Sequence, residues 1–284
     1  MLFKNEIVAG KLEQNGWVVI DFCTPEIIEN LKTVFFKSLP DLDEMPVIIS
    51  LLHERREVTK RIHHEILGEL NNILDLHFSD YKIPIALFFA KKKELGDIGL
   101  HQDPMITDQV TSPSYGIWIP TVETNTANGT IAVLDKSHRW FHPFQSDSFH
   151  SPFINICPHL QSQCKTLNLK PGQALIMDNR LVHYSHINTV DEIRPCVVIK
   201  ITHINSNYYT LFKKDADIFL IQNNSNFYLN ETWITDKSEF PSGVVEGILN
   251  FEPGTVTYEE FKDIAANNRL NHFQTQPITA WLKK

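Results

Sequence analysis

The sequence predicts a mainly β protein with flanking helices, built as a jelly-roll barrel or sandwich. Two observations support this fold class. Apolar residues recur with helical spacing in the first 80 residues and again near residue 260. Between these regions, short apolar runs alternate with turn signals such as Asn128-Gly129 and Pro171-Gly172, which is typical of barrels and sandwiches. The expected strands are residues 84–90, a strand at His101, and residues 115–120, 130–134, 165–169, 173–177 and 195–203.

The N-terminal region, residues 1–80, is expected to form one strand and three helices that support the barrel. Gly16 can end the first helix, because glycine adopts the left-handed conformation without strain. Thr24 offers an N-cap hydroxyl and Pro25 a first-turn proline to the second helix. The expected elements are a helix over residues 3–15, a strand over 17–22, and helices over 24–38 and 58–78.

The chain of 284 residues is expected to form a single domain, since a mixed β domain of this length can bury a substantial core. Residues 84–205 would form the β core, and residues 206–284 a C-terminal extension that packs on it. In the extension, Thr257 and Glu260 form a capping-box pattern that begins a helix. We assign no chemistry to the extension.

Composition and charge argue against several classes of function. A net charge of −8 offers no basic surface for nucleic acid. The four cysteines lack the spacing of a zinc site and are too few for a disulfide scaffold. Residues 1–6 lack the features of a signal peptide, and no apolar run is long enough to span a membrane. We therefore expect a cytoplasmic protein without a nucleic-acid or membrane partner, whose oligomeric state is left open.

Three residues form a pattern that suits a metal ion. In a strand, His101 and Asp103 would project from the same face because side chains alternate. A second imidazole from a distant strand would complete a 2-His-1-carboxylate site for Fe(II), which leaves three coordination positions open. His183 follows a strand-like apolar run and is the candidate. Arg194 opens the next strand and could bind a carboxylate, whereas Arg180 is expected on the opposite face from His183.

The ordered motifs around these residues resemble the phytanoyl-CoA dioxygenase family. Members of that family are Fe(II)/2-oxoglutarate oxygenases on a double-stranded β-helix, the cupin-like form of the jelly roll. The likeness covers roughly residues 10–205. It is carried by Gly99–Pro104, Gly116–Pro120, Asn128–Arg139, Pro171–Ala174 and His183 through Asn188 to Arg194, with an opening at Asn15–Ile20 and Thr24–Glu26.

The resemblance implies roles for five residues. It assigns His101, Asp103 and His183 to a catalytic iron. It assigns Arg194, with Ser185 alongside, to the distal carboxylate of 2-oxoglutarate. Related halogenases carry a small residue in place of the carboxylate so that chloride can bind the metal, and Asp103 therefore argues for hydroxylation or desaturation.

The function implied by this resemblance is that of an Fe(II)/2-oxoglutarate-dependent dioxygenase. It would use O2 to hydroxylate a small molecule, such as an amino acid or biosynthetic intermediate, and release succinate and CO2. Two alternatives remain: a cupin-like metalloenzyme without 2-oxoglutarate, and a β-barrel that binds a ligand without catalysis. Arg194 argues against the first, and the complete metal set against the second. Lys91, Lys92 and Lys93 are expected to form a solvated strand end, with a place beside an anionic ligand as the alternative for one of them.

Overall fold

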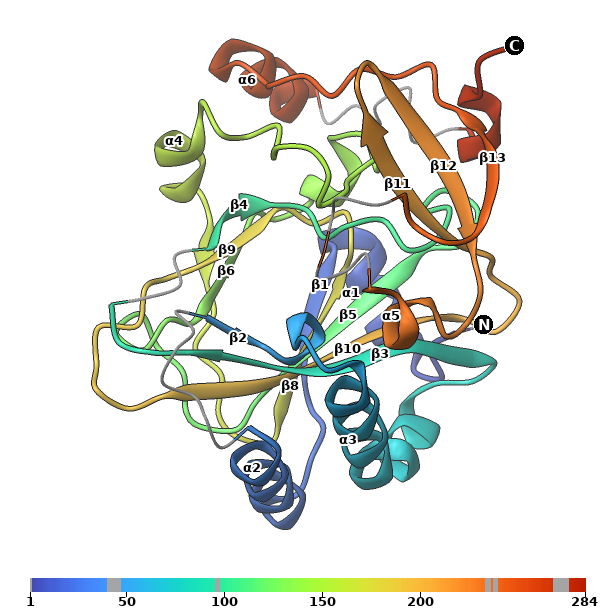
Figure 1. The fold of residues 1–284 in the computed structure, drawn as a ribbon. Helices are drawn as coiled ribbons and strands as arrows, with labels where there is room; N and C mark the ends of the chain where they lie inside the picture. The colour runs from blue at the N-terminus through green and yellow to red at the C-terminus, as the bar shows by residue number, and fades with distance from the viewer. Residues whose placement is uncertain (1, 40–46, 95–97, 233–235, 237–239, 268–275) are drawn as a thin grey trace.

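Two antiparallel sheets face each other and enclose an apolar interior (Figure 1). The structure is a computed structural model that describes residues 2–39, 47–94, 98–232, 236, 240–267 and 276–284. The larger sheet has six strands in the order β1-β8-β5-β10-β3-β2, and the smaller has four in the order β4-β9-β6-β7. This architecture confirms the mainly β jelly-roll prediction. The strands are β1 (Trp17–Asp21), β2 (Val47–Ile49), β3 (Tyr81–Lys91), β4 (Ile98–His101), β5 (Ser114–Pro120), β6 (Ile131–Val133), β7 (Lys165–Thr166), β8 (Gln173–Asp178), β9 (His183–Ser185) and β10 (Arg194–His203).

Helices α2 (Pro25–Ser38) and α3 (Arg56–His77) cover the outer face of the larger sheet (Figure 1). The buried residues of α3 recur every three or four positions, so they lie on one face of the helix. They belong to one apolar cluster together with the outward-facing residues of β10. These are Val197, Ile199 and Ile201.

The helix caps predicted from the sequence are present. Gly16 ends α1 (Glu6–Asn15) in the left-handed conformation, with φ of 83°. The Thr24 hydroxyl accepts a hydrogen bond from the Ile27 N–H at 3.4 Å, and Pro25 is the first residue of α2. These caps fix where the chain turns from each helix into the larger sheet.

Side chains from the helical layer satisfy the part of the β3 edge that the short strand β2 leaves open. The Ala86 N–H donates to His63 Nδ1 of α3 at 3.0 Å. The Phe88 N–H donates to the Ser50 hydroxyl at 3.0 Å, and Ser50 begins the 3-10 turn Ser50–Leu52. Because a buried edge with unpaired N–H groups is costly, these two contacts stabilise the larger sheet.

Strand β10 presents an unusual inner face to the space between the sheets. Val198 and Cys196 pack with apolar residues there, as expected for a barrel interior. Arg194 and Lys200 lie on the same face at the two ends of this row, because their spacing is even. Two cations therefore enter the barrel from a single strand.

The C-terminal extension forms a third sheet beside the barrel. Strands β11 (Tyr208–Lys214), β12 (Asp217–Asn223) and β13 (Val244–Ile248) are antiparallel. Leu211 and Leu220 of this sheet pack with Met105 and Phe144 of the preceding region. The extension also contains helices α5 (Phe227–Asn230) and α6 (Tyr258–Asn267) and the 3-10 turn Ile278–Trp281. Among the described residues, no helix is both long and apolar enough to cross a bilayer.

Several details differ from the sequence-based expectation. Strand β4 ends at His101, so Asp103 lies in the following loop and not on the strand. Strand β7 is only two residues long, because the chain at Leu167 and Leu169 pairs through isolated contacts. The three-stranded sheet of the extension was not predicted. Residues 95–97, which precede β4, lie outside the described residues.

Candidate metal centre

His101, Asp103 and His183 converge between the two sheets. One potential ligand atom from each lies within 4.8 Å of the other two. His183 Nε2 is 4.0 Å from Asp103 Oδ1, and the two imidazole rings are 4.2 Å apart between centres. Pairing of β4 with β9 sets His101 directly opposite His183. The structure thus brings together the three residues that the sequence suggests as metal ligands.

Backbone contacts define which nitrogen of each histidine faces this cluster. His101 Nδ1 is 2.8 Å from the Gly99 carbonyl, and His183 Nδ1 is 2.9 Å from the Leu181 carbonyl. Because a carbonyl only accepts, each Nδ1 must carry the hydrogen and donate it. A neutral imidazole held in this way presents Nε2 as its unprotonated nitrogen, which is the form in which imidazole binds metals.

Charge and burial keep His183 and Asp103 in the protonation states that bind a metal. Burial, together with the neighbouring His101, lowers the pKa of His183 to about 4. Burial alone would raise the pKa of Asp103, but Lys200, His183 and His101 lower it to about 2. Near neutral pH the cluster therefore contains a neutral imidazole at His183 and an ionised carboxylate at Asp103.

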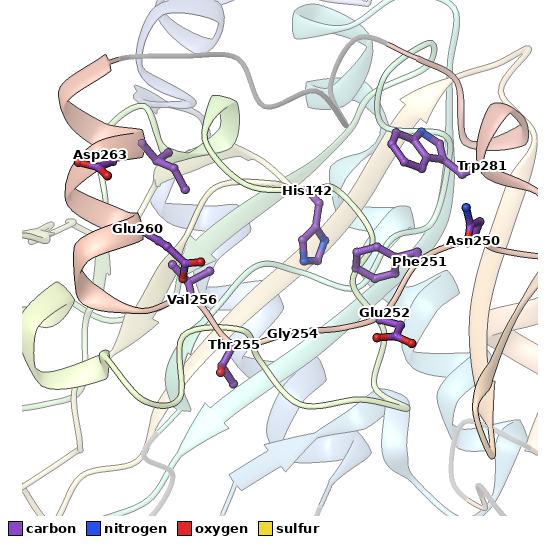
Figure 2. A pocket seen from close by; sticks show the side chains of 11 residues that line it. His142, Asn250, Phe251, Glu252, Gly254, Thr255, Val256, Glu260, Asp263 and Trp281 are labelled. Atoms are coloured by element: carbon purple, nitrogen blue, oxygen red, sulfur yellow. The ribbon is translucent and has the colours of Figure 1, made fainter.

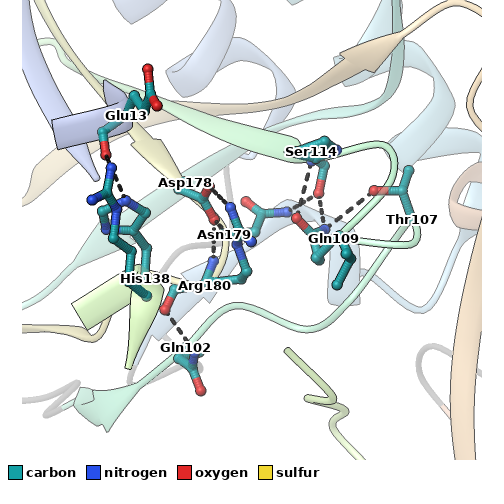
Figure 3. Close-up of polar contacts among 12 residues, drawn as sticks. Glu13, Gln102, Thr107, Gln109, Ser114, His138, Asp178, Asn179 and Arg180 are labelled. Atoms are coloured by element: carbon teal, nitrogen blue, oxygen red, sulfur yellow. Dashed lines mark hydrogen bonds and ion pairs between the residues drawn. The ribbon is translucent and has the colours of Figure 1, made fainter. Parts of the chain in front are cut away.

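The loop that carries Asp103 is fixed to the turn between β8 and β9. The Asp103 N–H donates to the Asn179 carbonyl at 3.0 Å. The Gln102 amide donates to the Arg180 carbonyl at 2.6 Å (Figure 3). Gln145 in turn donates to the Gln102 side chain at 3.1 Å. Strand alternation was therefore the wrong reason for the convergence of His101 and Asp103, since hydrogen bonds to a neighbouring turn orient the carboxylate.

Sequence reasoning did not identify Lys200, which contacts the cluster directly. Its ammonium donates to Asp103 Oδ2 and, at 2.9 Å, to Asn179 Oδ1. The Lys200 side chain is only 12% exposed. A lone lysine between Ile199 and Ile201 in an apolar strand was the signal that could have revealed it.

Arg194 is a buried cation without a carboxylate partner among the described residues. It is 1% exposed, and its Nε has no hydrogen-bond partner. One terminal nitrogen donates to the Cys196 sulfur at 3.4 Å. The guanidinium carbon lies 5.3 Å from the centre of the Trp118 ring and 5.7 Å from that of Phe89. Burial lowers the pKa of Arg194, and a guanidinium kept this dry is costly unless an anion binds it.

Arg180, the competing arginine, already has an anionic partner. Its Nε and one terminal nitrogen donate to the two carboxylate oxygens of Asp178, at 2.8 and 2.6 Å (Figure 3). Burial would raise the pKa of Asp178, but Arg180 lowers it below its usual range. This pair supports the turn that holds the Asp103 loop and leaves Arg194 as the better candidate for an external carboxylate.

Ser185 and Arg194 flank a further lysine, Lys91. Arg194 pairs in register with Lys91 on β3, and the Lys91 ammonium donates to the Ser185 carbonyl at 3.0 Å. It also donates to the His186 carbonyl at 2.6 Å. Lys91 is fully buried, so the expectation of a solvated strand end was wrong for this residue, whose side chain lies on the inner face beside Arg194.

One cavity near the C-terminal helix α6 lies apart from the metal-ligand cluster. It has a volume of about 520 Å³ and is bounded by α6 and the segments before and after it. Figure 2 shows His142, Phe251 and Trp281 on one side and Glu260 and Asp263 on α6. None of the suggested metal ligands lines it.

A double-stranded β-helix with a partly buried His-Asp-His cluster between its sheets defines the structural class. The family model described as phytanoyl-CoA dioxygenase matches residues 34–196, which include the whole cluster and Arg194. This chain therefore belongs to the phytanoyl-CoA dioxygenase family. A relative from Dictyostelium discoideum, the phytanoyl-CoA dioxygenase domain-containing protein 1 homolog, is 24% identical over 164 residues. That match covers 55% of this chain and 52% of the relative, so it spans about half of the relative's length.

Two solved structures share the fold. The non-heme alpha ketoglutarate dependent carbocyclase SnoK from nogalamycin biosynthesis has a TM-score of 0.53 at 13% identity, and the match covers 72% of this chain and 86% of SnoK. The epimerase SnoN, from the same biosynthesis and also described as alpha ketoglutarate dependent, has a TM-score of 0.50 at 14% identity, with 90% and 93% covered. At these identities the likeness establishes the double-stranded β-helix alone.

Proposed function

We propose that this protein is an Fe(II)/2-oxoglutarate-dependent oxygenase that hydroxylates a small molecule. In this proposal His101, Asp103 and His183 bind iron, and Arg194, with Ser185 beside it, binds 2-oxoglutarate. The observation that carries the proposal is the combination of the His-Asp-His cluster with a buried arginine that has no carboxylate partner among the described residues. Membership of the phytanoyl-CoA dioxygenase family supports the same assignment.

The donor set fits Fe(II). Two neutral imidazoles and one carboxylate are the ligands of the facial triad found in non-heme iron oxygenases. The backbone contacts at Gly99 and Leu181 direct both Nε2 atoms away from the carbonyls and toward the cluster. The ionised state of Asp103 supplies the negative charge that such a site needs.

The buried cations fit a dicarboxylate. Arg194 offers its planar fork of donors to the distal carboxylate, and the Trp118 and Phe89 rings exclude water around it. Lys91 adds positive charge on the adjacent strand. A cupin-like metalloenzyme without 2-oxoglutarate would have no use for this arginine, and a non-catalytic binder would not need the ionised ligand set.

Iron and 2-oxoglutarate together would supply O2 activation, with succinate and CO2 as co-products. The chain's own residues would position the reactants. Arg194 would hold the far carboxylate of the co-substrate, Asp103 and the two histidines would hold the metal, and the apolar walls would exclude water. Because the fold neighbours include a carbocyclase and an epimerase, hydroxylation is the specific outcome to be tested.

The test is a screen of amino acids and biosynthetic intermediates for substrate-dependent succinate release by the iron-loaded protein. We expect at least one compound to raise succinate above the substrate-free rate and to gain one oxygen atom by mass. A product that has lost two hydrogens or changed stereochemistry, without added oxygen, would retain the oxygenase class and refute hydroxylation. His183→Ala and Lys82→Met are the matched variants, since the first removes a proposed iron ligand and the second removes a lysine that contacts the Ser206 carbonyl.

A further inference from the structure

We propose that Lys200 is a positioning residue that holds Asp103 as a single-oxygen ligand of the metal. This inference rests on the proposed function, because it concerns the same centre. The Lys200 ammonium donates a hydrogen bond to Asp103 Oδ2, whereas Asp103 Oδ1 lies 4.0 Å from His183 Nε2. One oxygen therefore faces the ammonium and the other faces His183 Nε2.

Asn179 holds both ends of this arrangement. Its backbone carbonyl accepts the Asp103 N–H at 3.0 Å, and its side-chain oxygen accepts from Lys200 at 2.9 Å. The Asn179 amide then donates to the Ser114 hydroxyl at 2.7 Å. The Gln109 side chain contacts Ser114 by accepting its N–H at 3.1 Å and by donating to its hydroxyl (Figure 3). This network leaves Lys200 little freedom to choose another partner.

Gly116 provides the space for the ammonium. A Cβ at this position would lie 3.2 Å from Lys200 Nζ and 3.7 Å from Asn179 Oδ1. Gly116 does not have a positive φ, so backbone conformation does not require glycine there. The absence of a side chain therefore leaves room for the close approach of Lys200, and a Cβ here would push the ammonium by only a few tenths of an ångström.

The consequence is a defined number of open metal positions. Of six coordination positions, the two histidines would occupy two. A carboxylate that binds through both oxygens would occupy two more and leave two positions open. A carboxylate held by Lys200 occupies one and leaves three, which is what a chelating keto acid and O2 together require. Groups that orient metal ligands in this way typically change metal affinity or activity by about 10- to 100-fold when removed.

The experiment compares Lys200→Met with Lys82→Met, using Co(II) and 2-oxoglutarate without O2. Lys82 is a matched control on the same sheet: it is also partly buried, donates to the Ser206 carbonyl and lies 4.2 Å from the centre of the Tyr208 ring. The readouts are the visible d–d spectrum of bound Co(II), which reports coordination number, and the Kd of 2-oxoglutarate. We expect Lys200→Met to change the Co(II) spectrum and weaken 2-oxoglutarate at least 10-fold, Lys200→Arg to restore both, and Lys82→Met to match the wild type.

Three outcomes would overturn the inference. A wild-type Co(II) spectrum and Kd in Lys200→Met would show that Lys200 has only a structural role. An unchanged Co(II) spectrum with weaker 2-oxoglutarate binding would show that its charge acts on the co-substrate and not on Asp103. If Lys200→Met does not fold, Lys200→Gln, which keeps a polar end but removes the charge, replaces it, and an unchanged spectrum in that variant refutes positioning. A wild type that binds no Co(II) would instead refute the proposed function itself.

Discussion

Replacing Arg194 by methionine separates a role in ligand binding from a role in folding. If Arg194 serves ligand binding, the variant should bind 2-oxoglutarate more weakly but keep or gain stability without ligand. If Arg194 serves folding, the variant should lose stability. The side chain is 1% exposed, and no carboxylate pairs with it among the residues that the structure describes. A buried charge without a partner lowers the stability of the ligand-free protein. Methionine has similar length and no charge, so it should fill the same space between Trp118 and Phe89.

The magnitudes follow from this environment. Replacing buried ionic groups by apolar ones of similar volume is often neutral or stabilising by about 1–4 kcal/mol, so Arg194→Met should not lower the free energy of unfolding of the ligand-free protein. Removing one partner of a buried charge pair costs about 3–5 kcal/mol. Since each 1.4 kcal/mol is a factor of ten, the Kd of 2-oxoglutarate should rise about a hundredfold or more.

Arg180→Met is the matched control. Arg180 pairs with Asp178, and its removal leaves that 3% exposed carboxylate without its cation. We expect this variant to lose about 3–5 kcal/mol of stability. Urea unfolding of the metal-free proteins gives the stabilities, and calorimetric titration of the Co(II)-loaded proteins gives the affinities. Arg194→Met with lowered stability and unchanged 2-oxoglutarate binding would refute the assignment of Arg194.

Further predictions concern the scaffold around the site. Burial and the neighbouring His64 lower the pKa of His63 to about 4 from 6.5, so the unfolded chain binds a proton there as pH falls below about 6.5 while the folded chain does not. This group should therefore cost about 2 kcal/mol of stability between pH 7 and 5. His63→Asn retains an acceptor for the Ala86 N–H, and urea unfolding at both pH values should show a loss smaller by that amount; an equal loss would contradict the role of His63. Gly172→Ala should lower stability by about 1–3 kcal/mol, because φ is 92° and the new Cβ would lie 2.7 Å from the Cys23 carbonyl oxygen. Gly10→Ala in α1 should raise stability by up to about 1 kcal/mol, because the new Cβ would meet no atom within 4 Å. Thermal unfolding gives the midpoint of each variant, and equal shifts for Gly10→Ala and Gly172→Ala would count against the steric argument.

Local sequence signals predicted the elements that depend on local chemistry. Gly16, Thr24 and Pro25 act within one turn of a helix, so their effect on helix ends could be read directly. The inner strands were found because buried strands are continuous apolar runs. The sheet of the extension was missed since residues 209–222 mix polar and apolar residues without a clear period.

The cluster itself was predicted better than its surroundings. Histidine and aspartate in the order of a known family pointed to His101, Asp103 and His183, but nothing local shows that Asp103 leaves the strand and bonds to the turn after β8. The positions of Lys91 and Lys200 depend on strand register, which pairs residues about a hundred positions apart. A lysine reads as solvated in a sequence unless the register is known.

Anaerobic titration of the metal-free protein with Fe(II) and then 2-oxoglutarate tests the central claim most directly. We predict that the wild type develops the weak visible charge-transfer band of a chelated keto acid. His183→Ala should show no band, and Arg194→Met should need about a hundredfold more 2-oxoglutarate to reach it. Iron binding without a band would contradict the 2-oxoglutarate assignment and favour a cupin-like metalloenzyme. Failure of the wild type to bind iron would contradict the metal centre and leave a β-barrel that binds a ligand without catalysis.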